Sequence, residues 1–170
     1  NRPNVVGTLK GRGDGKSLIL NGHIDVVSPE PVAKWKHNPW GAEIEEGKLY
    51  GRGSCDMKSG VAAMIMAVKC IQDLGLKPKG KVMLNTVIEE EDGGVGGTLA
   101  TILKGHTADG AIVTEPTGPS RMYIGNSGVR YFKIGIVGKT FHAAKAHAGV
   151  NAIGKAMKIY SALNELNEYR

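Results

Sequence analysis

One histidine and several carboxylates in this 170-residue chain have the chemistry to bind a metal ion together. They lie directly before or after apolar segments and are His23, Asp25, Asp56, the acidic run 89–92 and Glu115. Imidazole and carboxylate groups are ligands that suit zinc, and they also suit manganese and cobalt. A group of like charges is unfavourable unless protons or cations neutralise it. These residue types therefore predict a divalent metal site, provided that the fold brings them together.

Each of these residues also has an ordinary structural explanation. A histidine after a strand commonly forms hydrogen bonds within a loop, and Asp25 alone could form a turn. Asp56 alone could cap a helix, and the acidic run 89–92 alone could be a solvated loop. Only their convergence at one place in the fold favours a metal site over coincidence.

The apolar pattern predicts the elements that must position these side chains. Apolar segments predict strands over residues 5–9, 17–22, 81–88 and 108–114, with a turn at 11–15 that joins the first two. Apolar spacings of three and four predict helices over residues 60–74 and 98–103. The long stretch 29–53 is irregular, and a loop of that length is usually functional.

Alternation of strands with helices predicts an α/β fold with a mostly parallel sheet and covering helices. In such sheets, ligands bind at the carboxyl ends of the strands, where most of the candidate residues are expected. After Pro116 and Pro119 the pattern changes to a strand over 129–137 and a helix over 150–166. We therefore expect two domains, residues 1–120 and 121–170, of which the second is too small to build a good core alone.

Charge and composition limit the function classes. The net charge is +6, and the segment from residue 129 onward holds seven Lys and Arg against two Asp and Glu. This predicts attraction of an anionic ligand, or simply a solvated basic face. Nucleic acid is not an expected partner, because only two Phe accompany the charge. No membrane partner is expected either, because the longest apolar run, 61–68, is too short to span a bilayer.

Cysteine usage and the first residues bear on the cellular setting. Cys55 and Cys70 form no disulfide framework, so a reduced, cytoplasmic protein is expected. The chain begins without Met and shows no charged and apolar leader, so we expect its natural start to lie further upstream.

Four short motifs resemble, in the same order, the metal-binding motifs of one enzyme family. They are His-Ile-Asp-Val-Val at 23–27, Gly-Arg-Gly-Ser-Cys-Asp-Met-Lys-Ser-Gly at 51–60, Glu-Glu-Glu-Asp-Gly-Gly at 89–94, and Glu-Pro-Thr at 115–117. The family is that of the zinc-dependent metallopeptidases and deacylases, which includes acetylornithine deacetylase, succinyl-diaminopimelate desuccinylase, aminoacylase and glutamate carboxypeptidase. The resemblance covers nearly the whole chain.

The resemblance implies a role for each candidate residue. His23 and Glu115 would bind one metal, Asp56 would bridge two metals, and Glu91 would bind the second. Glu90 would be the general base, and Asp25 would orient the His23 ring, as is common for metal-bound imidazole. The cofactor would be two zinc ions per complete site, with cobalt or manganese as alternatives. The Asp56–Met57 peptide bond is a candidate for the cis form found in the family.

Residues 137–142 and 149–153 resemble the start of the small α+β lid or dimerisation domain of this family. His142 matches a histidine that enters the partner subunit's site and helps to hold the oxyanion or a substrate carboxylate, which implies a homodimer. Family members are much longer than this chain, so it resembles an incomplete member. The last histidine ligand of the second metal is missing, because His37, His106 and His147 lie at the wrong places. An isolated fragment is therefore expected to bind the second metal poorly.

The resemblance implies metal-dependent hydrolysis of the amide bond of an N-acyl amino acid. The basic second segment favours a carboxylate-bearing substrate, and Glu115 favours the deacylase branch over the peptidases. A dipeptidase or carboxypeptidase is the alternative within the class. A metal-binding or dimerisation fragment without catalysis is the alternative outside it.

Overall fold

The computed structural model describes residues 2–118, 120–128 and 131–168. By contacts, the chain divides into two compact units, Asn1–Tyr123 and Ile124–Arg170. A catalytic segment and a lid segment, divided after residue 120, stay a prediction, because compactness alone assigns neither role. Among the described residues, no helix is both long and apolar enough to cross a membrane.

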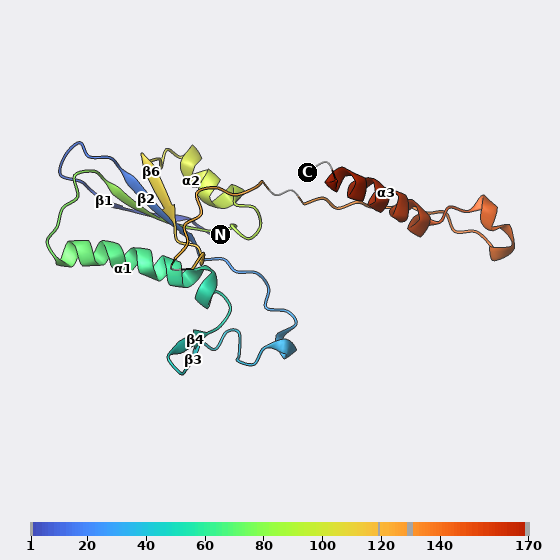
Figure 1. Ribbon diagram of the computed structural model, residues 1–170, viewed down its shortest axis with the longest axis horizontal. Coiled ribbons are helices and arrows are strands. Elements are labelled where there is room, and N and C mark those ends of the chain that lie inside the picture. The colour runs from blue at the N-terminus through green and yellow to red at the C-terminus, as the bar shows by residue number, and fades with distance from the viewer. Residues whose placement is uncertain (1, 119, 129–130, 169–170) are drawn as a thin grey trace. The chain divides into compact units, whose positions relative to one another are not determined.

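A four-stranded sheet in the order β1-β5-β2-β6 forms the centre of the first unit (Figure 1). Its strands are β1 (Val5–Leu9), β2 (Leu18–His23), β5 (Val82–Val87) and β6 (Gly110–Val113). β5, β2 and β6 run parallel, whereas β1 is antiparallel to β5. This confirms the expected α/β class with a mostly parallel sheet. β1 and β2, which the turn at 11–15 connects, are not neighbours, because β5 lies between them.

Helix α1 (Ser59–Asp73) covers one face of the sheet. Its apolar stripe of Val61, Met64 and Val68 packs against Leu20 of β2, and fully buried Met57 extends the stripe toward the N-terminus. Successive residues of β2 point to opposite faces, and the next residue, Asn21, donates a hydrogen bond to Thr98 Oγ1 (3.3 Å). Thr98 belongs to the irregular turn Val95–Leu99 before the short helix α2 (Ala100–Leu103), so this segment covers the other face.

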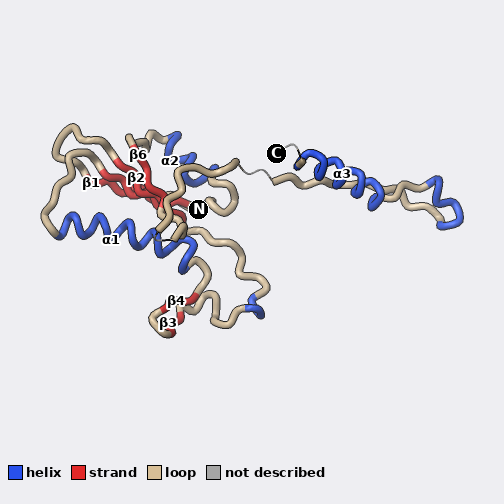
Figure 2. Tube along the Cα trace, viewed as in Figure 1, coloured by secondary structure: helices blue, strands red, loops and turns tan. Residues whose placement is uncertain are grey.

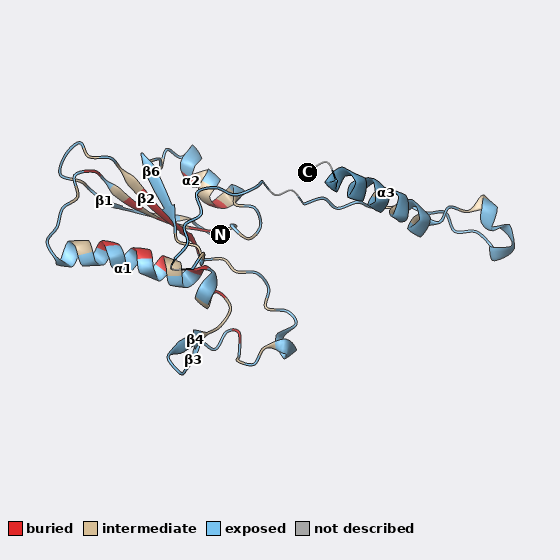
Figure 3. Ribbon diagram, in the orientation of Figure 1, coloured by how far each residue is buried: buried red, intermediate tan, exposed pale blue. Residues whose placement is uncertain are grey.

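β2 is therefore the most deeply buried strand, with five of its six residues buried (Figure 3). Burial on both faces gives the near-continuous apolar run Leu-Ile-Leu that predicted this strand, which then ends in the buried polar residues Asn21 and His23. The stretch between β2 and α1 contains a 3₁₀ turn, Val32–Lys34, and a small hairpin of β3 (Glu43–Glu45) and β4 (Lys48–Tyr50) (Figure 2).

A close approach joins the start of α1 to the end of β6. A Cβ atom on Gly60 would overlap the carbonyl oxygen of Thr114. Glycine at this position therefore lets the first turn of α1 lie directly against the backbone that leads to Glu115. The same approach brings the turn before α1, which carries Asp56, to the carboxyl edge of the sheet.

The second unit contains a 3₁₀ segment, Ala143–Ala148, and helix α3 (Ala152–Asn167). Asn151 caps α3, because its Oδ1 accepts hydrogen bonds from the N–H groups of Ile153 (2.9 Å) and Gly154 (3.3 Å). The strand expected over 129–137 is wrong for its described part, since residues 131–137 have no strand pairing; residues 129–130 lie outside the described residues. A strand needs a partner strand, and the one bridge in this described stretch of the chain joins Lys139 to Val150.

Candidate metal centre

His23 is the centre of the candidate site and the last residue of β2. Its side chain is 1% exposed, and its backbone N–H donates to the sulfur of Met57 (3.1 Å). Ring Nδ1 lies 2.9 Å from the backbone oxygen of Asp25. A carbonyl oxygen only accepts, so Nδ1 carries the proton. In the neutral ring, Nε2 is then free to bind a metal ion.

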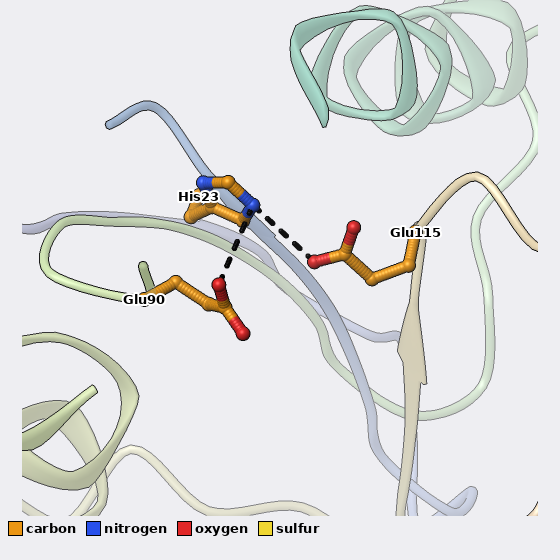
Figure 4. Close-up of side chains that lie close together, drawn as sticks. All are labelled: His23, Glu90 and Glu115. Atoms are coloured by element: carbon orange, nitrogen blue, oxygen red, sulfur yellow. Dashed lines mark ion pairs between the residues drawn. The ribbon is translucent and has the colours of Figure 1, made fainter. Parts of the chain in front are cut away.

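Three carboxylates surround Nε2 of His23. Asp56 Oδ1 lies at 3.2 Å, Glu115 Oε1 at 3.4 Å and Glu90 Oε2 at 3.8 Å. Figure 4 shows Glu90 and Glu115 converging on this nitrogen from two different segments. No described Lys or Arg forms an ion pair with any of the three carboxylates.

The parallel sheet explains this convergence. His23 ends β2, Glu90 follows β5 and Glu115 follows β6, and these three parallel strands end at one edge. Asp56 comes from the irregular turn Ser54–Lys58 that leads into α1. The Asp56–Met57 peptide bond is cis, as the resemblance implies.

Asp25 contacts both His23 and the acidic turn. Its Oδ2 accepts a hydrogen bond from the N–H of Glu91 (3.2 Å), and its Oδ1 lies 3.4 Å from His23 Nδ1. Oδ1 is buried and has no hydrogen-bond partner of its own. Asp25 therefore fixes the orientation of the ring and the position of the Glu91 backbone together.

The structure offers two sets of atoms that could hold an ion. One set is His23, Asp56 and Glu91, and the other is His23, Glu90 and Glu115; within each set, all ligand atoms lie within 4.8 Å of one another. The second set includes Glu90, for which the resemblance implies the role of base rather than ligand. An experiment on Glu90 must therefore separate loss of metal from loss of a base.

Crowding of carboxylates changes the protonation of the site. The pKa of Glu115 is raised to about 7: burial is the largest cause, His23 opposes it, and the charges of Asp56 and Glu90 add to it. Burial would lower the pKa of His23, but the Asp25 carbonyl and the carboxylates of Glu115, Glu90 and Asp25 outweigh it and raise this pKa. A cation bound here would replace protons as the neutralising charge.

For Glu115→Gln we expect the metal-free chain to be more stable than wild type at pH 8, with a difference that vanishes near pH 4.5. The folded-state pKa of about 7 lies above the ordinary 4.5. The folded chain thus binds more protons, and stability is lost as pH rises through 7. About 1 kcal/mol would raise the midpoint by about 2–4 °C at this chain length. Thermal unfolding in EDTA measures the difference, and equal midpoints at pH 8 would contradict it.

The other histidines have different surroundings. His37 lies between Glu43 (2.9 Å) and Glu45 (3.4 Å) and stacks on Tyr50, with ring centroids 3.9 Å apart. His142 belongs to the second unit, where its Nδ1 accepts a hydrogen bond from the N–H of Ala144 (3.2 Å). Its neutral ring therefore carries the proton on Nε2, which can donate to an anionic oxygen.

Sequence reasoning missed one residue that positions the site. Met57 is fully buried, and its sulfur accepts the backbone N–H of His23. A signal was present in the sequence: Met57, Val61, Met64 and Val68 continue one apolar helical spacing. Met57 therefore belongs to the hydrophobic core and contacts the backbone of His23.

Fold and cluster together define an α/β domain with a histidine–carboxylate site at the carboxyl edge of a parallel sheet. The sequence profile of peptidase family M20/M25/M40 matches residues 19–160. The chain therefore belongs to this family, as its motifs predicted.

Relatives and solved structures agree with this membership. The chain is 39% identical to N-formyl-4-amino-5-aminomethyl-2-methylpyrimidine deformylase of Bacillus subtilis, over 98% of this chain and 41% of that protein. It is 34% identical to succinyl-diaminopimelate desuccinylase of Methylobacterium nodulans, over 88% of this chain and 40% of that protein. An M20 family metallo-carboxypeptidase from Sulfolobus solfataricus superposes with a TM-score of 0.58 at 30% identity, over 66% of this chain and 26% of that one. The chain thus spans about two fifths of the length of these curated relatives.

Proposed function

We propose that the protein containing this chain hydrolyses the amide bond of an N-acyl amino acid with the help of divalent metal ions. The observation that carries the proposal is the free Nε2 of buried His23, which faces three carboxylates at the ends of parallel strands. Membership of a peptidase family supports hydrolysis of amide bonds in general. The names of two relatives, a deformylase and a desuccinylase, support removal of an acyl group.

The residues present fit a divalent cation. Histidine nitrogen and carboxylate oxygen are zinc ligands and also suit cobalt or manganese. The pKa of Glu115 is raised mainly by burial, and the charges of Asp56 and Glu90 raise it further, so a bound cation would favour its ionised form. We propose that His23, Asp56 and Glu115 hold one ion, and that Asp56 and Glu91 hold a second. Bound there, the cations supply Lewis acidity that polarises a carbonyl and acidifies water.

The role of general base is proposed for Glu90. Its side chain is about half exposed, and Oε2 lies 3.8 Å from His23 Nε2. We assign to this oxygen the proton of the attacking water, which Glu90 then delivers to the leaving nitrogen. A C–O bond forms, the C–N bond breaks, and the products are a carboxylic acid and an amine.

The charge of the second segment supports the proposed substrate class. The segment from residue 129 onward holds seven basic against two acidic residues, which favours a substrate with a carboxylate. The free Nε2–H of His142 would help to hold that carboxylate or the oxyanion. A homodimer, in which this histidine reaches the partner's site, and a cytoplasmic location both stay predictions.

A peptidase is the second candidate. The likeness to the Sulfolobus solfataricus metallo-carboxypeptidase favours it, as does a TM-score of 0.56 to aminopeptidase PepT from Bacillus cereus at 25% identity. In a peptidase, the same cluster would act on a peptide bond rather than on an acyl cap.

A hydrolysis assay tests the proposal and separates the two candidates. The whole protein is supplied with zinc, manganese or cobalt and tested on N-formyl, N-acetyl and N-succinyl amino acids and on dipeptides. We expect amine release from N-acyl amino acids that EDTA abolishes. Cleavage of dipeptides alone would favour the peptidase. Metal binding without turnover of any amide would contradict catalysis and favour the non-catalytic alternative.

A further inference from the structure

The turn that carries Glu90 and Glu91 follows β5 and has no regular structure of its own before residue 95. Its backbone folds back on itself, because Gly94 N–H donates to the carbonyl oxygen of Glu89 and Gly93 N–H donates to that of Glu90. These contacts are local. Additional contacts must fix the turn relative to the sheet, since Glu90 and Glu91 have to face His23.

One contact from outside the turn is that of Asp25, whose Oδ2 accepts from the N–H of Glu91 (3.2 Å). The side chain of Glu89 makes two further contacts. Its Oε2 accepts a hydrogen bond from the N–H of Gly96 (3.1 Å), seven residues further along the chain. Its Oε1 accepts from Arg2 Nη2 (2.8 Å). Because Arg2 is 63% exposed, that ion pair is expected to contribute little. The bond to Gly96 joins the two ends of the turn, as does Asn4, which contacts both Ile88 and Gly96.

The backbone conformation of Glu89 indicates that surrounding contacts hold this residue in place. Its φ is +60°, a left-handed value that is uncommon for a residue with a side chain. Such conformations persist where the surrounding structure holds them. At this position the value reverses the chain directly after Ile88, so that the following residues turn toward His23.

Both backbone polar groups of Gly96, its N–H and its carbonyl oxygen, form hydrogen bonds. Its N–H donates to Glu89, and its carbonyl oxygen accepts from Asn4 Nδ2 (2.7 Å), while Asn4 Oδ1 accepts from the N–H of Ile88 (3.1 Å). A Cβ atom on residue 96 would overlap the Glu89 carboxylate. Glycine at position 96 therefore permits the close approach of the Glu89 carboxylate. The side chains of Glu89 and Asn4 together join the two ends of the turn by hydrogen bonds.

We infer that Glu89 is a positioning residue whose carboxylate, through Gly96, holds the acidic turn so that Glu90 and Glu91 face His23. The inference rests on the proposed function, since it assigns the turn to a metal site. The Glu89 carboxylate pairs with Arg2 and Gly96, and with neither His23 nor the other proposed ligands among the described residues. It acts only through the backbone that carries them.

Zinc affinity of the whole protein that contains this chain, and of four variants of it, tests the inference. It is measured by competition with a chromogenic chelator at equal folded fraction. Glu89→Gly removes the carboxylate and also accommodates the left-handed φ, whereas Glu89→Gln keeps an oxygen that accepts from Gly96. We expect Glu89→Gly and Glu89→Ala to bind zinc on the order of tenfold more weakly, the range for residues that orient ligands. Glu89→Gln and Arg2→Ala are expected to bind like wild type.

Amide hydrogen exchange in EDTA provides a second measurement that needs no metal. We expect the N–H groups of Gly96 and Glu91 to exchange faster in Glu89→Gly than in wild type, and Glu89→Gln to restore their protection. Wild-type zinc affinity or unchanged exchange in Glu89→Gly would overturn the inference. If wild type binds none of zinc, manganese and cobalt, the proposed function fails, and exchange alone then decides whether Glu89 holds the turn.

Discussion

Glu90→Gln in the whole protein is expected to lower kcat for amide hydrolysis by about 10²–10⁴, the usual contribution of a general acid–base group. Glutamine has nearly the same shape but accepts no proton at neutral pH. Glu90 lies 3.8 Å from His23 Nε2 and belongs to one possible ligand set, so loss of activity alone does not identify a base. Metal content must therefore be measured on the same samples, by atomic absorption.

The matched control for this variant is Asp92→Asn, which removes a charge from the same acidic turn without touching the cluster. Asp92 belongs to neither ligand set, so its variant should keep both metal and activity. Full metal content with collapsed kcat in Glu90→Gln supports the assignment of a base. Parallel loss of metal and activity would instead make Glu90 a ligand, and unchanged kcat would exclude both roles.

The second large effect is expected for His23→Asn, which should weaken metal binding. Loss of a residue that only orients a metal ligand weakens binding by about 10–100-fold, and loss of the ligand itself should weaken it further. His23 contributes to both ligand sets and is the only nitrogen ligand in either. Asparagine retains some polar hydrogen bonding toward Asp25 but provides no imidazole nitrogen for a metal. Calorimetric titration of zinc into the chain measures the loss.

His37→Asn is the control for this second variant, because His37 also lies beside two glutamates but outside both ligand sets. It should bind zinc like wild type. Because His23 is almost fully buried, urea unfolding in EDTA must accompany the titration. Wild-type zinc affinity in a folded His23→Asn chain would show that zinc binds elsewhere.

The apolar pattern predicted both ends of β1, β2, β5 and α1 to within one residue. The strong apolar run of β2 and the apolar stripe of α1 reflect burial, and burial is readable from sequence. The insertion of β5 between β1 and β2 was not readable, because a short connecting turn between two strands does not require them to pair. The strand expected over 129–137 failed for its described part because alternation shows which residues suit a strand but supplies no partner.

The candidate site was predictable in outline, because parallel strands place their carboxyl ends at one edge. His23, Glu90 and Glu115 converge for that reason, and the turn before α1 adds Asp56. Finer features depend on backbone atoms that no motif specifies. The Asp25 carbonyl that sets the ring proton of His23 is one example, and the bond between Glu89 and Gly96 is another. The position of His142 in the assembled site stays a prediction.

X-ray diffraction at the zinc absorption edge, from crystals of this chain grown with zinc, tests the central claim most directly. The account predicts an anomalous peak about 2.0–2.2 Å from His23 Nε2 and from carboxylate oxygens of the cluster, the usual zinc–ligand distances. A zinc peak only at another place, such as beside His37 and its glutamates, would contradict the claim. The claim would also be contradicted if the cluster were well ordered in these crystals but no anomalous density lay between His23, Asp56 and Glu115.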